Sequence, residues 1–153
     1  MMEFTPTEVI LKRAKAAAAC PALRDTAAKN RALAAMAQEL AKRGFAVPVC
    51  PEQLGGLPTP RKPSERRGER VVMNDGRDVT AEYRRGAEEA LRLAQLYGCT
   101  AAVLKEKSPS CGCGRVYDGT FSGTLTDGDG VTAELLEENG IRVYGESELE
   151  KLL

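Results

Sequence analysis

Apolar residues recur at the three- and four-residue spacing of amphipathic helices in several parts of the chain. The segment Thr5–Glu8 has the residue types of a capping box, with proline at the first helical position, and predicts a helix that runs to about Ala19. The same reasoning predicts helices over residues 26–43, 78–97 and 130–139, and a short last helix over residues 146–152. Glycine directly follows the helices predicted at 26–43, 78–97 and 130–139, and glycine is typical of a helix C-terminal cap.

Short apolar runs alternate with these helices. Three of them predict buried strands: Phe45–Val49, Thr100–Leu104 and Ile141–Val143. Strands that alternate with helices indicate an α/β fold, and we expect a single domain over residues 1–153 with three layers and a mostly parallel, Rossmann-like sheet.

Two long segments between the predicted elements are rich in proline, glycine or serine. Residues 50–70 and 105–123 are predicted to be loops, and long loops in compact domains are often functional. Each loop follows a predicted strand directly, and the two loops carry Cys50 and Cys111. Because ligands of parallel sheets bind beyond the carboxyl ends of the strands, we expect both thiols at one end of the sheet.

The charge balance and the absence of histidine narrow the possible chemistry. The 153 residues include 22 basic and 22 acidic side chains, so the net charge is zero and a strongly basic nucleic-acid binder is excluded. With no histidine, the chain cannot form a Ser-His-Asp triad, a Cys-His dyad or a Cys₂His₂ zinc site. Proton transfer must use carboxylate, lysine, tyrosine, cysteine or water, and any metal must be held by thiolate or oxygen.

Five cysteines are present, at positions 20, 50, 99, 111 and 113. The N-terminal segment lacks the apolar region of a signal peptide, and no run long enough to span a membrane occurs, so we expect a cytosolic protein. Disulfides are rare in that compartment, and cysteine there indicates metal binding, catalysis or apolar packing. We expect Cys99, which precedes a predicted strand, to be a small core residue.

Several long motifs occur in order along the chain: CPEQLGGLPTPR, GRDVT, LKEKSPSCG, YDGTFSG and GDGVTAELLEENGI. Together they resemble the 2-thiouracil desulfurase family, a bacterial family formerly known as a domain of unknown function. The resemblance covers about residues 47–146 and defines a desulfurase-like core, whereas residues 1–46 form a divergent N-terminal part that is predicted to be helical.

The resemblance implies a 4Fe–4S cluster that is held by three cysteines and has one iron without a protein ligand. It implies a desulfidase that converts a thiocarbonyl C=S, in thiouracil or a related thiolated pyrimidine, to C=O without net redox change. Cys50 and Cys111 match two of the cluster ligands. Glu52 matches the proposed acid/base, and Ser108 matches a residue beside the substrate. Lys105 is a further candidate for a substrate contact.

The third cluster ligand falls in the divergent segment. Cys20 fits an Ala-Cys pair of the family and is the predicted ligand, with Cys113 as the alternative. Two other functions stay open: a non-catalytic iron–sulfur or zinc sensor or sulfur carrier, and a degenerate member without the cluster.

A small thiolated nucleobase is the expected partner. The charge-rich segment 61–70 is typical of a solvated face, and contact with a nucleotide phosphate or thiolated tRNA is the less favoured interpretation.

Overall fold

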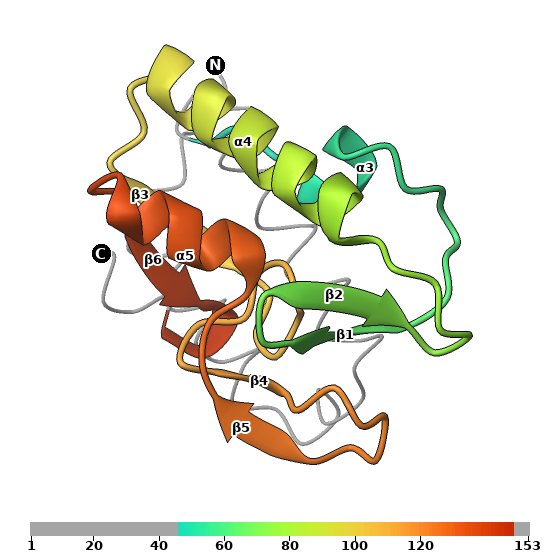
Figure 1. Cartoon of the computed structure of the whole chain (residues 1–153). Coiled ribbons are helices and arrows are strands. Elements are labelled where there is room, and N and C mark those ends of the chain that lie inside the picture. Colours follow the sequence, from blue (N-terminus) through green and yellow to red (C-terminus); the bar gives the residue numbers. More distant parts are fainter. Residues whose placement is uncertain (1–45, 149–153) are drawn as a thin grey trace, which may run out of the picture. The chain divides into compact units, whose positions relative to one another are not determined.

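The computed structural model describes residues 46–148, of which residues 49–148 belong to one compact unit (Figure 1). The elements in chain order are α3 (Pro51–Leu54), β1 (Ser64–Arg67), β2 (Arg70–Met73), α4 (Thr80–Leu96), β3 (Ala101–Leu104), β4 (Arg115–Tyr117), β5 (Leu125–Asp127), α5 (Val131–Glu138) and β6 (Arg142–Gly145). The helices predicted over residues 5–19 and 26–43, and Cys20 between them, lie outside the described residues.

The described strands form three two-stranded sheets. β3 pairs with β6 in parallel, with Ala101 opposite Arg142 and Leu104 opposite Gly145. The pairs β1–β2 and β4–β5 are antiparallel. The prediction of an α/β protein is confirmed as a mixed α/β fold that includes a parallel pair, whereas the larger three-layer, mostly parallel sheet stays a prediction.

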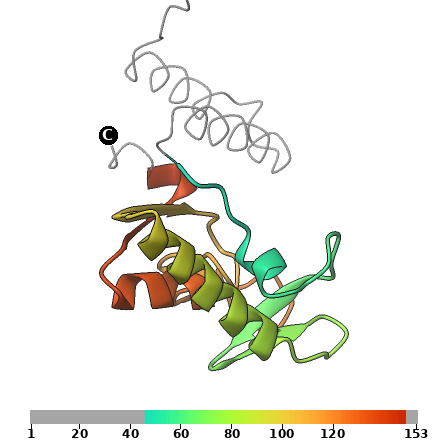
Figure 2. The same cartoon turned by 90° about the horizontal axis from the view of Figure 1, so that it is seen from above.

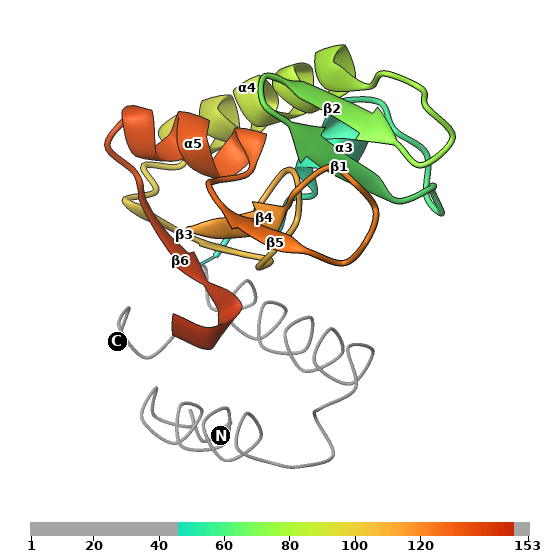
Figure 3. The same ribbon diagram turned by 60° about the horizontal axis from the view of Figure 1, so that its bottom comes forward.

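One apolar cluster lies between the two long helices and the parallel pair. Figure 3 shows α4 and α5 on one side of β3 and β6. The cluster joins residues from all four elements, from the turn before β6 and from the loop before β4: Ala133, Leu136, Ile141 and Val143, with Leu91, Ala94, Ala102, Leu104 and Cys113 packed against them. Helix α4 contributes Leu91 and Ala94 to this cluster, and Tyr83, nearer its start, belongs to a second cluster.

A second apolar cluster supports the other end of the unit. Its buried members are Leu57, Val71, Met73, Val79 and Tyr83. It joins the chain after α3 and strand β2 to the start of α4. The start of α4 is held by Asp78, whose Oδ1 accepts hydrogen bonds from the backbone N–H of Thr80 (3.0 Å) and from its hydroxyl (2.6 Å).

Helix α3 lies against the first turns of α4, and their backbones touch (Figure 2). A Cβ atom built at Gly86 would overlap the carbonyl oxygen of Pro51, and one built at Gly55 would overlap the carbonyl oxygen of Glu82. Arg85 adds a hydrogen bond from Nε to the carbonyl oxygen of Gly55, at 3.0 Å. The two glycines therefore set the distance between α3 and α4.

Several predicted elements are corrected by the structure. Residues 46–49 of the strand predicted at Phe45–Val49 are not extended in a sheet, and the predicted loop 50–70 contains α3 and β1. The predicted loop 105–123 contains β4, and β5 was not predicted. These strands escaped the apolar criterion because most of their side chains are polar, and the apolar strand β2 was not predicted either. Residues 146–148 form a single 3₁₀ turn at the start of the short last helix that was predicted.

Candidate functional site

Cys50, Glu52 and Arg61 form a compact polar group at the start of α3. Cys50 is the residue before the helix and has an extended backbone, and Glu52 lies in the first turn. The Cys50 thiol donates to Glu52 Oε2 at 3.3 Å, and Arg61 Nη2 donates to the same oxygen at 3.1 Å. Arg61 Nη2 also lies 3.5 Å from Cys50 Sγ. All three pairs of atoms are therefore within direct contact.

The guanidinium of Arg61 is fixed on its other side. Nη1 donates to the carbonyl oxygen of Pro58 at 3.2 Å and to Thr59 Oγ1 at 3.0 Å. Gln53 Nε2, from α3, donates to Thr59 Oγ1 at 2.9 Å. Burial acts to lower the pKa of Arg61, but Glu52 and then Cys50 outweigh this, so its pKa is raised and the side chain stays charged.

Cys111 lies in a tight loop that packs on the start of α5. Ser108 Oγ accepts hydrogen bonds from the backbone N–H groups of Ser110 (3.1 Å) and Cys111 (3.2 Å). The buried Ser110 and Thr132 hydroxyls are 2.9 Å apart. A Cβ at Gly130 would overlap the carbonyl group of Ser110, so glycine allows the loop to approach the helix. The sequence motif around Cys111 thus produces a rigid loop.

The surroundings of Cys111 disfavour a free thiolate. Its side chain is buried, at 8% exposure. Burial raises the pKa of the Cys111 thiol to about 12, and the charge of Glu52 and then that of Cys50 act in the same direction. The structure shows the contact between Cys50 and Glu52, and a joint site with Cys111 stays a prediction. A thiol in this setting becomes a thiolate when a metal replaces its proton.

Tyr83, on α4, is a buried titratable residue that the sequence did not indicate. Burial raises its pKa to about 12, and Glu52 and Cys111 add to the rise while Arg61 opposes it. Tyr83 packs in the second apolar cluster. Its place in the apolar pattern of the helix therefore indicated a core residue and not a site residue. Arg61 could have been predicted as a site residue, because it is the last residue of the motif CPEQLGGLPTPR.

The structure shows no contact of Lys105, Cys113 or Cys99 with the Cys50 group. Lys105 is exposed, and its backbone makes a hydrogen bond that lowers the pKa of Cys111. The structure shows no contact from the Lys105 side chain, so its substrate role stays a prediction. Cys113 packs against the cluster of α5 and β6. Burial raises the pKa of its thiol, and the charges of Glu137, Asp129, Glu148 and Glu106 act in the same direction. Cys99 is half-buried.

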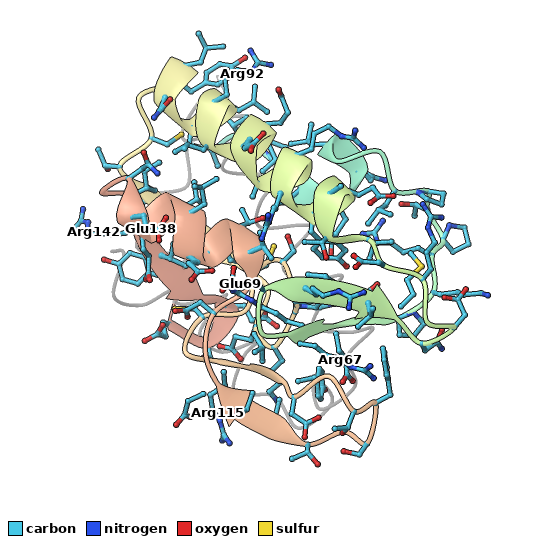
Figure 4. The ribbon with its side chains drawn as sticks, viewed as in Figure 1. Arg67, Glu69, Arg92, Arg115, Glu138 and Arg142 are labelled. Carbon is cyan, nitrogen blue, oxygen red and sulfur yellow. The ribbon has the colours of Figure 1, made fainter. Side chains whose placement is uncertain are left out.

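The basic residues of segment 61–70 are paired within the protein. The ion pairs are Arg61–Glu52, Lys62–Asp75, Arg66–Glu134 and Arg70–Asp78, and Arg67 donates to the carbonyl oxygen of Gly119. In Figure 4 the labelled Arg67, Arg92 and Arg115 lie apart from one another on separate elements. This pairing favours a structural, solvated role for the segment over a surface for nucleic acid. Among residues 46–148, no helix has the length and hydropathy to cross a bilayer.

Comparisons with known proteins give a consistent result. A family model described as 2-thiouracil desulfurase matches residues 24–148. The uncharacterized protein YbbK of Bacillus subtilis (strain 168) is 46% identical over 118 residues, which cover 71% of this chain and 78% of that protein. A solved structure of the 4Fe–4S-dependent thiouracil desulfidase TudS is 52% identical, with a TM-score of 0.73, and the match covers 75% of this chain and 76% of that one.

Proposed function

Because this chain belongs to the 2-thiouracil desulfurase family and is an enzyme of the desulfidase class, we propose that it removes sulfur from a thiolated pyrimidine at a 4Fe–4S cluster. The observation that carries the proposal is the direct contact of Cys50 with Glu52 and Arg61 at the start of α3. The similarity to a thiouracil desulfidase that depends on such a cluster supports both the cofactor and the substrate class.

The donor set fits an iron–sulfur cluster better than a hard cation. The two predicted ligands that the structure describes, Cys50 and Cys111, are cysteines, and thiolates are soft ligands that select iron–sulfur clusters or zinc. Within residues 46–148 no three cysteine or carboxylate side chains come together as a metal site. A three-thiolate set that uses Cys50 and Cys111 therefore needs a cysteine from outside the described residues.

We assign that third position to Cys20. The described alternative, Cys113, packs against the apolar cluster of α5 and β6. Cys99 follows the end of α4 and precedes β3, and nothing in the structure connects it to the Cys50 group. Cys20 is the remaining cysteine of the five.

When bound, a cluster with one iron free of protein ligands would supply a soft Lewis acid that accepts the sulfur of the substrate. The protein supplies the proton transfers. The net reaction adds water to the C=S carbon and releases sulfide, so C=S and H₂O become C=O and H₂S with no electrons exchanged. Glu52 would take a proton from the attacking water, and its side chain is 17% exposed, which leaves it reachable from the site.

Ser108 would orient the substrate with its remaining proton. Its oxygen already accepts two backbone N–H groups, so its own O–H is free to donate to the substrate ring. We extend the proposal to a single domain over residues 1–153 with a larger parallel sheet, of which β3–β6 is the described part. We also propose a cytosolic location, a reducing compartment in which cysteine ligands of a cluster stay reduced.

The test is an anaerobic turnover assay with 4-thiouracil and the enzyme reconstituted with iron and sulfide. The wild-type enzyme should release one sulfide for each thiocarbonyl lost, with no added reductant or oxidant. Glu52→Gln should keep the cluster spectrum and lose about 10²- to 10⁴-fold in kcat, the usual contribution of a general base. Full turnover by Glu52→Gln with its cluster intact would remove Glu52 from the mechanism.

A further inference from the structure

We infer that Arg61 is a positioning residue that holds the Glu52 carboxylate beside the Cys50 sulfur once that sulfur is bound to iron. The inference rests on the proposed function, because it assumes that Cys50 is a cluster ligand. Arg61 touches both partners through one nitrogen, at 3.1 Å from Glu52 Oε2 and 3.5 Å from Cys50 Sγ.

Metal binding changes what holds Glu52 in place. In the metal-free protein the Cys50 thiol donates to Glu52 Oε2 at 3.3 Å. A metal-bound thiolate has no proton to donate. The sulfur and the carboxylate oxygen are then two negatively charged groups in contact, and their attraction becomes repulsion. Within the described residues, Arg61 supplies the hydrogen-bond donor that still joins them.

The Arg61 guanidinium is built to stay in this position. Its Nη1 side is held by the Pro58 carbonyl oxygen and by Thr59 Oγ1, which in turn accepts from Gln53. The side chain is only 22% exposed. A planar guanidinium can bridge two sets of acceptors at once, whereas the single ammonium of lysine cannot span both. We therefore expect lysine at this position to restore only part of the function.

Without Arg61, no positive charge would offset the repulsion between the Glu52 carboxylate and the Cys50 thiolate. Partners that orient metal ligands typically contribute 10- to 100-fold in metal affinity or activity. For Arg61→Met we expect iron to be lost to a chelator about 10- to 100-fold faster than from the wild type. We also expect kcat to fall by a similar factor with KM changed much less, because substrate binding is not the affected step.

The closing experiment is a double-mutant cycle that uses chelator-driven iron release as its readout. Glu52→Gln removes the negative charge, so in that background Arg61→Met should accelerate iron release by less than about threefold. The matched control is Lys62→Met, which removes a neighbouring cation from the exposed pair with Asp75 and should release iron at the wild-type rate. Arg61→Lys should lie between the wild type and Arg61→Met.

Each outcome decides one question. An Arg61→Met variant that loses iron at the wild-type rate overturns the inference alone. Equal acceleration by Arg61→Met with Glu52 and with Gln at position 52 also overturns it, because Arg61 would then act on the fold or on Cys50 and not through the carboxylate. A wild-type protein that binds no iron overturns the proposed function, and the inference with it.

Discussion

Replacement of Gly86 by alanine tests the contact that sets the position of the Cys50 loop. A Cβ at Gly86 would lie 2.8 Å from the carbonyl carbon of Pro51, whereas carbon atoms in good contact are about 3.5–4.0 Å apart. Helix α3 would have to move by about 1 Å. Overpacking of this kind costs about 1–3 kcal/mol. Alanine in a helix interior recovers about 0.5–1 kcal/mol of this relative to glycine.

The expected net effect is a loss of about 1–2 kcal/mol in the free energy of unfolding. For a chain of this size that corresponds to a fall of roughly 2–8 °C in Tm, measured by circular dichroism on the metal-free protein. Pro51 directly follows Cys50, so movement of α3 also displaces the Cys50 sulfur and the Glu52 carboxylate. We therefore expect Gly86→Ala to hold less iron after reconstitution than the wild type does.

Two further variants make this prediction refutable. Gly55→Ala places a Cβ 2.9 Å from the carbonyl carbon of Glu82, in the same helix contact. The double variant should therefore lose less stability than the sum of the two single losses. Glu88→Ala, at an exposed position of α4, should change stability by less than about 0.5 kcal/mol. If Gly86→Ala is more stable than the wild type, the gain in helix propensity exceeds any cost of overlap, and the close backbone contact between Gly86 and Pro51 is not present in the protein.

Three more outcomes follow from the contacts of single side chains. Ser108→Ala removes two hydrogen bonds to the Cys111 loop and should lower the free energy of unfolding of the metal-free protein by about 1–3 kcal/mol in a urea titration; no loss would mean that the loop is held by other contacts. Hydrogen bonds from the Thr80 hydroxyl lower the pKa of Asp78 to about 2, so its stabilising effect is complete above pH 4 and is lost as the pH falls toward 2. The Tm difference between wild type and Asp78→Ala should accordingly shrink over that interval, and a constant difference would contradict the assignment. Burial raises the pKa of Tyr83 to about 12, so an ultraviolet titration should show one late-ionising tyrosine that Tyr83→Phe lacks, and ionisation of all tyrosines near pH 10 in the folded protein would count against it.

The helices that bury one face were predictable from the sequence, and the short polar strands were not. Helix α4 and helix α5 follow the apolar period closely enough that their ends were predicted to within two residues. Strand β1 carries the sequence SERR, which has no apolar alternation. It pairs with the adjacent strand β2, and its buried residue Glu65 accepts a hydrogen bond from the backbone N–H of Phe121, a distant partner that sequence patterns do not report.

The reason given for placing Cys50 and Cys111 at one end of a sheet holds only in part. Both cysteines were expected after buried strands, and Cys111 does follow β3, whereas residues 46–49 before Cys50 are not a strand. Cys50 is positioned instead by the backbone contact between α3 and α4. The contacts of Arg61 with Cys50 and Glu52 depend on the path of the chain through Pro58 and Thr59, which composition does not specify.

Iron content across a series of cysteine variants tests the central claim most directly. Each protein is purified without oxygen, reconstituted with iron and sulfide, and measured for iron and sulfide per chain. Cys20→Ser, Cys50→Ser and Cys111→Ser should each lose most of the cluster, while Cys99→Ser and Cys113→Ser should match the wild type at about four irons per chain. Full iron content in Cys50→Ser or Cys111→Ser, or loss of iron in Cys113→Ser with retention in Cys20→Ser, would contradict the ligand set proposed here.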